Sequence, residues 1–133
     1  MVMLDTNICV HLLRYHAPVL RDRLVAADSP LISSVVYAEL CYGIHLSPDP
    51  LQAPRWQQLQ QFVDLLTVVD WDSAAAEHYG QIRAVLRQQG ALIANMDLLI
   101  AAHARSLDCL LVTNNEREFQ RVAGLRVENW LTG

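Results

Sequence analysis

Apolar positions occur along this chain in two arrangements. Short apolar runs predict strands at residues 2–5, 31–33, 67–69, 109–113 and, at an edge, 125–127. Segments with helical periodicity predict helices at residues 6–14, 51–66, 73–89 and 96–107. Further helices are expected from residue 18 onward, from residue 33 or 34 to about 47, and, as a short helix, through residues 119–122. The alternation of short strands with helices predicts an α/β fold around a mostly parallel sheet, with ligands at the carboxyl ends of its strands.

Several residues mark the ends of these elements. Pro18 suits the first position of a helix, and the segment 47–50, Ser-Pro-Asp-Pro, predicts a break between two helices. Gly90 is expected to stop the long helix before it. Asn95 is a candidate cap for the apolar helix that follows.

Size and composition indicate one compact domain over residues 1–133, because 53% of the residues are hydrophobic. No apolar stretch has the length of a membrane span and the N-terminus does not resemble a signal peptide, so we expect a cytoplasmic protein that does not enter a membrane. The widely spaced cysteines within apolar segments favour reduced core thiols over disulfides or a zinc site. They are Cys9, Cys41 and Cys109.

The net charge of -4 argues against a protein that holds nucleic acid by its overall charge. The chain has no lysine, so all ten basic residues are arginines. Arginine suits the geometry of phosphate, and a local basic rim around an acidic centre is compatible with this composition. For most of these arginines taken individually, a solvated helix face is the better explanation.

Four carboxylates stand in apolar surroundings. Asp5 ends the first strand, Glu39 and Asp97 interrupt apolar helices, and Glu118 follows the most strand-like run of the chain. A carboxylate on an apolar element is costly to desolvate unless a cation or hydrogen bonds stabilise it. Gathered together, these four would form a site for a hard divalent cation such as Mg²⁺ or Mn²⁺.

Each carboxylate also has a structural explanation. Asp5 caps a helix well, and Asp97 in a first turn suits the helix dipole. Glu39 has no basic residue three or four positions away, so a structural role would need a distant partner. The spacing Asn115-x-x-Glu118 is also a capping-box pattern. The joint arrangement favours chemistry, because metal-dependent hydrolysis of a phosphodiester needs a few carboxylates around one or two ions.

Four segments, in their order and approximate spacing, resemble the signature blocks of PIN-domain ribonucleases: MLDTN, SSVVYAEL, NMDLLIAAHA and LLVTNNEREFQRV. They are most similar to the VapC toxin group of bacterial toxin–antitoxin pairs, and the ending GLRVENWL is similar too. The resemblance covers essentially the whole chain. It implies a three-layer α/β/α sandwich with a mostly parallel central sheet of four to five strands.

The resemblance also implies an activity and partners. The expected protein is a Mg²⁺-dependent endoribonuclease toxin, with Mn²⁺ as an alternative ion, that cuts structured RNA, often a tRNA anticodon loop, and so arrests translation. It implies a VapB-type antitoxin, whose C-terminal tail fills the cleft, and a toxin homodimer.

By position, Asp5, Glu39 and Asp97 match the acidic residues of the family's metal site. Thr6 and Asn7 match the polar residues that support the first of these acids. The resemblance therefore implies that the three acids bind metal and are catalytic.

The fourth block departs from the family pattern. Thr113 matches the hydroxyl that orients the acidic cluster, but Asn115 stands where many relatives have a fourth Asp. Glu118 is the candidate that would replace this charge and join the catalytic set. Whether one or two ions bind stays open.

Other functions fit the sequence less well. A catalytically inactive PIN-like module that binds RNA or a protein partner would need a broken acidic triad, and this one is complete. A phosphoaspartyl enzyme would need a second Asp two residues after Asp5, and no glycine-rich phosphate loop is present. The histidines lack metal-binding spacing, and the tryptophans fit core or interface positions better than base stacking. They are His11, His16, His45, His78, His103, Trp56, Trp71 and Trp130.

Overall fold

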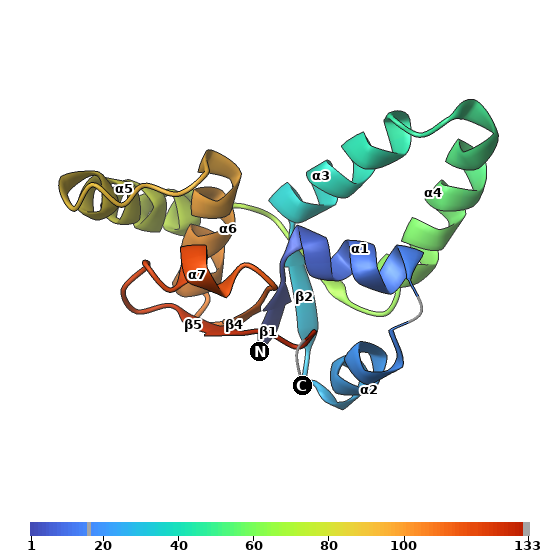
Figure 1. Ribbon diagram of the computed structural model, residues 1–133, viewed down its shortest axis with the longest axis horizontal. Coiled ribbons are helices and arrows are strands. Elements are labelled where there is room, and N and C mark those ends of the chain that lie inside the picture. Colours follow the sequence, from blue (N-terminus) through green and yellow to red (C-terminus); the bar gives the residue numbers. More distant parts are fainter. Residues whose placement is uncertain (16, 132–133) are drawn as a thin grey trace.

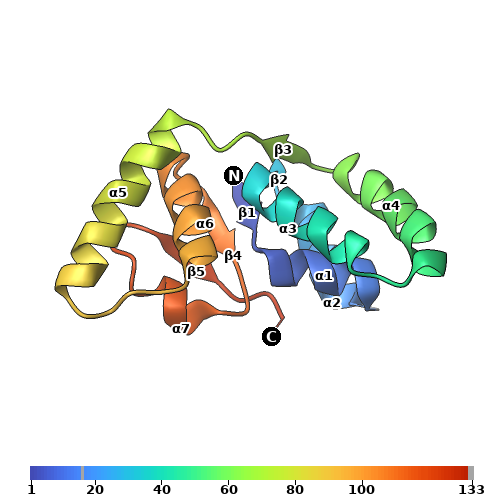
Figure 2. The ribbon, with the colours of Figure 1, turned by 90° about the horizontal axis from the view of Figure 1, so that it is seen from above.

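The computed structural model describes residues 1–15 and 17–131 and shows one five-stranded sheet with helices on both sides (Figures 1 and 2). The elements in chain order are β1 (Val2–Leu4), α1 (Thr6–Arg14), α2 (Pro18–Ala26), β2 (Pro30–Ser33), α3 (Ser34–His45), α4 (Asp49–Val63), β3 (Thr67–Val69), α5 (Ser73–Gln88), α6 (Asn95–Ser106), β4 (Leu110–Val112), α7 (Glu116–Phe119) and β5 (Arg126–Glu128). The expected α/β class and parallel sheet are confirmed. His16 lies outside the described residues.

The strand order is β3-β2-β1-β4-β5, and all four neighbouring pairs are parallel. The chain moves outward from β1 to β3 and then crosses to the other side of β1 to form β4 and β5. Because such crossovers are right-handed, the change of direction places α1 to α4 on one face and α5 to α7 on the other. In Figure 2, α5 and α6 lie on one side of β1, and α1 and α3 lie on the other.

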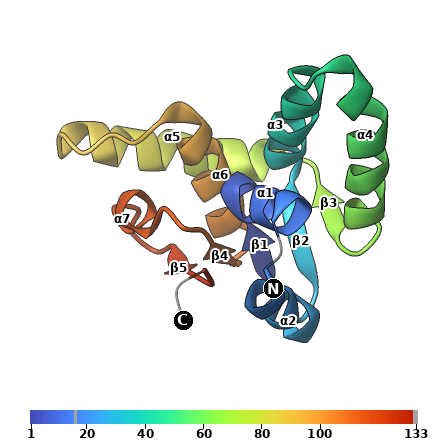
Figure 3. The ribbon, with the colours of Figure 1, turned by 45° about the vertical axis from the view of Figure 1, so that its right-hand side comes forward.

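The core lies on both faces of the central strands. Met3, Leu4 and Leu111 are fully buried, as expected for strands covered by helices on each side. Helices α3 and α4 form one arm of the molecule, and α5 and α6 form another (Figure 3). Within residues 1–15 and 17–131, no helix is both long and apolar enough to cross a membrane.

Most predicted boundaries agree with the structure, and the exceptions have local causes. The fourth helix begins at Asp49 and not at residue 51, because Pro48 and Pro50 are tolerated at a helix start. Gly90 follows α5 with a φ of 65°, as expected for a residue that ends a helix. Asn95 does not cap α6; Ala94 occupies the cap position, and the Asn95 side chain accepts a hydrogen bond from Tyr79.

Candidate functional site

The carboxylates singled out from the sequence come together at the carboxyl edge of the sheet. Asp5 directly follows β1 and Thr113 directly follows β4, and these strands are parallel neighbours. The first turn of α6 carries Asp97 from one face of the sheet, and α3 carries Glu39 from the other. This is the edge at which an α/β sheet is expected to bind ligands.

Asp5 is almost completely buried, with 3% of its surface exposed. Its Oδ1 accepts a hydrogen bond of 2.7 Å from the backbone N–H of Thr6, and its Oδ2 accepts one of 2.7 Å from the Thr113 hydroxyl. The Thr113 oxygen in turn accepts from the backbone N–H of Asn115, at 2.9 Å. Asp5 therefore caps α1, as the sequence predicted. The hydroxyl of Thr113, which follows β4, also orients the Asp5 carboxylate.

Glu39 reaches the same place through a different hydroxyl. The Thr6 hydroxyl donates to Glu39 Oε1 over 2.7 Å, which links α1 to α3 across 33 residues of sequence. Thr6 is therefore the distant partner that a structural role of Glu39 would need. Because the partner is a neutral hydroxyl, the negative charge of Glu39 is not neutralised by it.

The four acids lie close enough for their charges to repel one another. Burial is the first cause that raises the pKa of Asp97, to about 6. The other causes are the negative charges of three neighbours, which are Asp5, Glu39 and Glu118. Burial likewise raises the pKa of Asp5, although its hydrogen bonds act in the opposite direction. Among the described residues, only Glu118 of these four acids has an ion pair, with Arg121 at 3.5 Å.

The turn after β4 completes the edge of the site. Asn115 occupies the cap position of α7, but its side chain forms no capping hydrogen bond there, so the capping-box explanation is wrong for this residue. Instead its Nδ2 lies 3.5 Å from Asp97 Oδ2. Asn7 is exposed and its Nδ2 donates to Asn114 Oδ1 at 3.4 Å, so it joins α1 to the same turn.

The donor atoms at this site fit a hard cation. They are carboxylate, hydroxyl and amide oxygens, and no arginine of the described chain forms an ion pair with Asp5, Glu39 or Asp97. No group of three His, Cys, Asp or Glu side chains in that part of the chain is already arranged to hold an ion. Mg²⁺ retains several waters and usually takes only one or two carboxylates directly, so a looser arrangement suits a hydrated ion.

A buried histidine, not assigned to the site from sequence, connects the two helices that carry Glu39 and Asp97. His103 of α6 is fully buried, and its Nδ1 lies 2.7 Å from the hydroxyl oxygen of Ser33, which caps α3. Its Nε2 has no hydrogen-bond partner among the described residues. The sequence signals were a lone histidine in an apolar helix and an expected serine cap, and neither alone showed that they meet.

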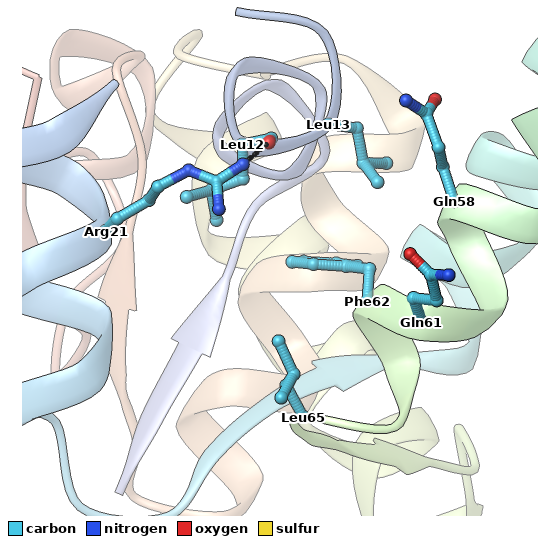
Figure 4. A pocket seen from close by; sticks show the side chains of 7 residues that line it. All are labelled: Leu12, Leu13, Arg21, Gln58, Gln61, Phe62 and Leu65. Carbon is cyan, nitrogen blue, oxygen red and sulfur yellow. Dashed lines mark hydrogen bonds between the residues drawn. The ribbon is translucent and has the colours of Figure 1, made fainter. Parts of the chain in front are cut away.

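A pocket of about 210 Å³ lies elsewhere on the molecule, between α1, α2 and α4 (Figure 4). The residues that line it are Leu12, Leu13, Arg21, Gln58, Gln61, Phe62 and Leu65. Arg21 reaches across α1 and donates to the carbonyl of Leu12 over 3.1 Å. No carboxylate lines this pocket, so it is not part of the carboxylate site.

Comparisons with known proteins identify the family of this chain. The PIN domain family model matches residues 2–125. A tRNA(fMet)-specific endonuclease VapC from Shigella flexneri is 44% identical over 96% of both chains. A ribonuclease VapC2 from Haemophilus influenzae is 41% identical over 97% of both.

A solved structure shares the fold closely. The structure of VapBC2 from Rickettsia felis bound to a DNA fragment from their promoter contains a chain with a TM-score of 0.91 and 38% identity. The alignment covers 98% of the present chain and 99% of that chain. From the match to the family model and the full-length relatives, the chain belongs to the PIN-domain family, within its VapC group of ribonucleases.

Proposed function

We propose that this protein is the toxin of a VapBC pair and a Mg²⁺- or Mn²⁺-dependent endoribonuclease that cleaves tRNA. The observation that carries the proposal is the group of four acids at the carboxyl edge of the sheet, three of which have no ion pair among the described residues. PIN-domain ribonucleases generally depend on divalent metal, and the Shigella flexneri relative is named for a tRNA. An inactive binding module has no comparable need for these uncompensated charges.

In this proposal Asp5, Glu39 and Asp97 hold the ion. When bound, Mg²⁺ or Mn²⁺ would supply Lewis-acid stabilisation of the phosphate charge and lower the pKa of a coordinated water. The hydroxyls of Thr113 and Thr6 keep the Asp5 and Glu39 carboxylates in place before the ion arrives. Such preorganisation reduces the rearrangement that the reaction requires.

The partners follow from the relatives. The R. felis structure contains a VapB together with its VapC, and we propose a VapB-type antitoxin for this chain, bound to a homodimer of the toxin. We expect the complex to form in the cytoplasm, where tRNA is available. A neighbouring reading frame of antitoxin type would support this assignment.

The function is tested by expressing the chain without an antitoxin. We expect growth to stop and sequencing of RNA 5′ ends to show new cleavage sites in tRNA. Asp5→Asn should abolish both effects, while Asp64→Asn, at the exposed end of α4, controls for the lost charge. Full toxicity of a folded Asp5→Asn protein, as judged by circular dichroism, would contradict the site.

The roles of Glu118 and Asn115 can be separated by opposite charge changes. If Glu118 contributes to the metal site, Glu118→Gln should raise the Mg²⁺ concentration needed for half-maximal cleavage severalfold. The loss of its partly exposed ion pair with Arg121 should cost only about 0–1 kcal/mol of stability. Asn115→Asp should lower that Mg²⁺ concentration but destabilise the metal-free protein, since it places another negative charge near Asp97.

Neighbouring residues supply matched controls for this pair. Glu116→Gln removes the same charge from α7, and Asn114→Asp adds the same charge to an exposed position of the turn. A Glu118→Gln enzyme with unaltered metal dependence would assign Glu118 to its ion pair with Arg121 alone.

A further inference from the structure

Two arginines outside the carboxylate site lie together without an opposite charge. Arg14, in the last turn of α1, and Arg55 of α4 line the same small pocket between α1, α3 and α4. Arg55 donates to the hydroxyl of Ser47. Neither guanidinium forms an ion pair with an acidic residue in the described part of the chain.

Their proximity has an electrostatic cost. Burial is the first cause that lowers the pKa of Arg14, and the positive charge of Arg55 is the second. Arginine stays protonated in proteins, so the two like charges persist at neutral pH. An arrangement of this kind is stabilised by an anion that contacts both guanidinium groups.

In this small pocket, polar donors stand beside aliphatic side chains. Its polar lining consists of the two arginines and the amide of Gln58, while the remaining residues are aliphatic. These are Leu13, Leu40, Ile44 and Leu59. The donors suit phosphate oxygens, and the apolar floor needs no charged partner.

The pocket and the carboxylate site lie along the same pair of helices. Helix α1 packs against α3, and the Thr6–Glu39 hydrogen bond joins them near the carboxylates. Further along, Leu13 and Arg14 of α1 meet Leu40 and Ile44 of α3 at the pocket. Figure 1 shows α1 leading from the end of β1 towards α4.

The separation suits a polymeric substrate. Asp5 precedes α1 and Arg14 ends it, which corresponds to roughly 13 Å along the helix axis. We propose that Arg14 and Arg55 bind a backbone phosphate of the RNA substrate, away from the phosphate that is cleaved. This inference rests on the proposed ribonuclease function. It explains how a chain of net charge -4 holds a polyanion near a group of acids.

Binding is measured with a single-stranded RNA in the Asp5→Asn background, so that the RNA stays intact. Replacing both arginines, Arg14→Gln with Arg55→Gln, should weaken binding about tenfold and reduce the slope of log Kd against log salt by about 0.7, the value for one phosphate contact. In the active enzyme the same change should raise KM more than it lowers kcat. Arg83→Gln with Arg87→Gln, both exposed on α5, removes the same two charges and controls for net charge.

Other outcomes are equally informative. Affinity and salt slope equal to those of the double variant of Arg83 and Arg87 would overturn the inference while leaving the ribonuclease function intact. Unchanged RNA binding with weaker binding of a hexaglutamate peptide would assign the pair to an acidic protein partner and also overturn it. If the double variant does not fold, the single variants and Arg55→Lys, which keeps the charge but loses the planar fork, decide the question.

Failure of the proposed function gives a different result. A wild-type protein that cleaves no RNA with Mg²⁺ or Mn²⁺ would contradict the ribonuclease assignment. The salt dependence of RNA binding would then still show whether Arg14 and Arg55 contact a phosphate.

Discussion

Asp97→Asn is expected to abolish RNA cleavage and at the same time stabilise the metal-free protein. Removing a metal ligand should lower kcat/KM by at least about a hundredfold, the upper range for residues that only support a ligand. The stabilisation follows from the pKa of Asp97, which its buried and negatively charged surroundings raise from 3.8 to about 6. A neutral amide keeps the shape without the repulsion.

The direction of the pH effect follows from proton binding. Between pH 3.8 and about 6 the folded protein binds more protons at Asp97 than the unfolded chain does, so stability falls as pH rises through this interval. At pH 7.5 Asp97 is ionised in the folded protein, so the full cost of its charge lowers the stability. Because Asp97 is partly exposed and solvent screens its charge, we expect this charge to destabilise the fold by only about 1–2 kcal/mol. Asp97→Asn should therefore raise the Tm by a few degrees.

Thermal unfolding in EDTA at pH 7.5 and pH 4 checks this. The variant should melt above the wild type at pH 7.5, and the difference should nearly disappear at pH 4, where wild-type Asp97 is mostly protonated. Asp64→Asn should show no such pH-dependent gain. A variant less stable than the wild type by the same amount at both pH values would mean that Asp97 has a purely structural role.

The second large effect is stabilisation by metal. Mg²⁺ or Mn²⁺ should raise the Tm of the wild type, because a ligand that binds only the folded protein stabilises it by about 2.7 kcal/mol at a hundredfold excess over Kd. Glu39→Gln should remove most of this rise, since Glu39 is the acid that α3 contributes. Glu77→Gln, on an exposed face of α5, is the matched control.

Metal binding should also weaken in acid. Below pH 6 a proton competes with the ion for Asp97, so the metal concentration at half-saturation should rise up to about tenfold per pH unit. An unchanged melting curve at about 10 mM metal, a concentration suited to a weak site, together with undiminished cleavage in EDTA, would contradict a metal-dependent mechanism.

Much of the fold could be predicted from local patterns. The short apolar run of β1 and the periodicity of α5 each depend on residues close in sequence, and both elements appear where expected. Helix α4 was expected at residues 51–66 and spans Asp49–Val63, so both of its ends were misplaced. The error at its start arose because Pro48 and Pro50 can either break a helix or begin one. Only contacts with the rest of the molecule select between these outcomes.

The candidate site was predictable as a set of residue types but not as a set of contacts. Apolar surroundings without a nearby cation marked Asp5, Glu39 and Asp97, and the four sequence blocks indicated their family. Asn115 occupies the cap position of α7, but its side chain forms no capping hydrogen bond there, contrary to the capping-box alternative. Its side chain is instead directed towards Asp97 of another helix, 18 residues away in sequence.

The sequence by itself determined the α/β class and the order of the elements and singled out the four acids as candidates, because each of these depends on the pattern of residues within one element. The tertiary structure decided which groups meet. Thr113 reaches Asp5 across 108 residues and His103 reaches Ser33 across 70, since the crossover from β3 to β4 places β4 beside β1 and α6 beside α3. Hydrogen bonds and charge repulsion act over a few ångströms, so these contacts exist only after the sheet has brought the segments together.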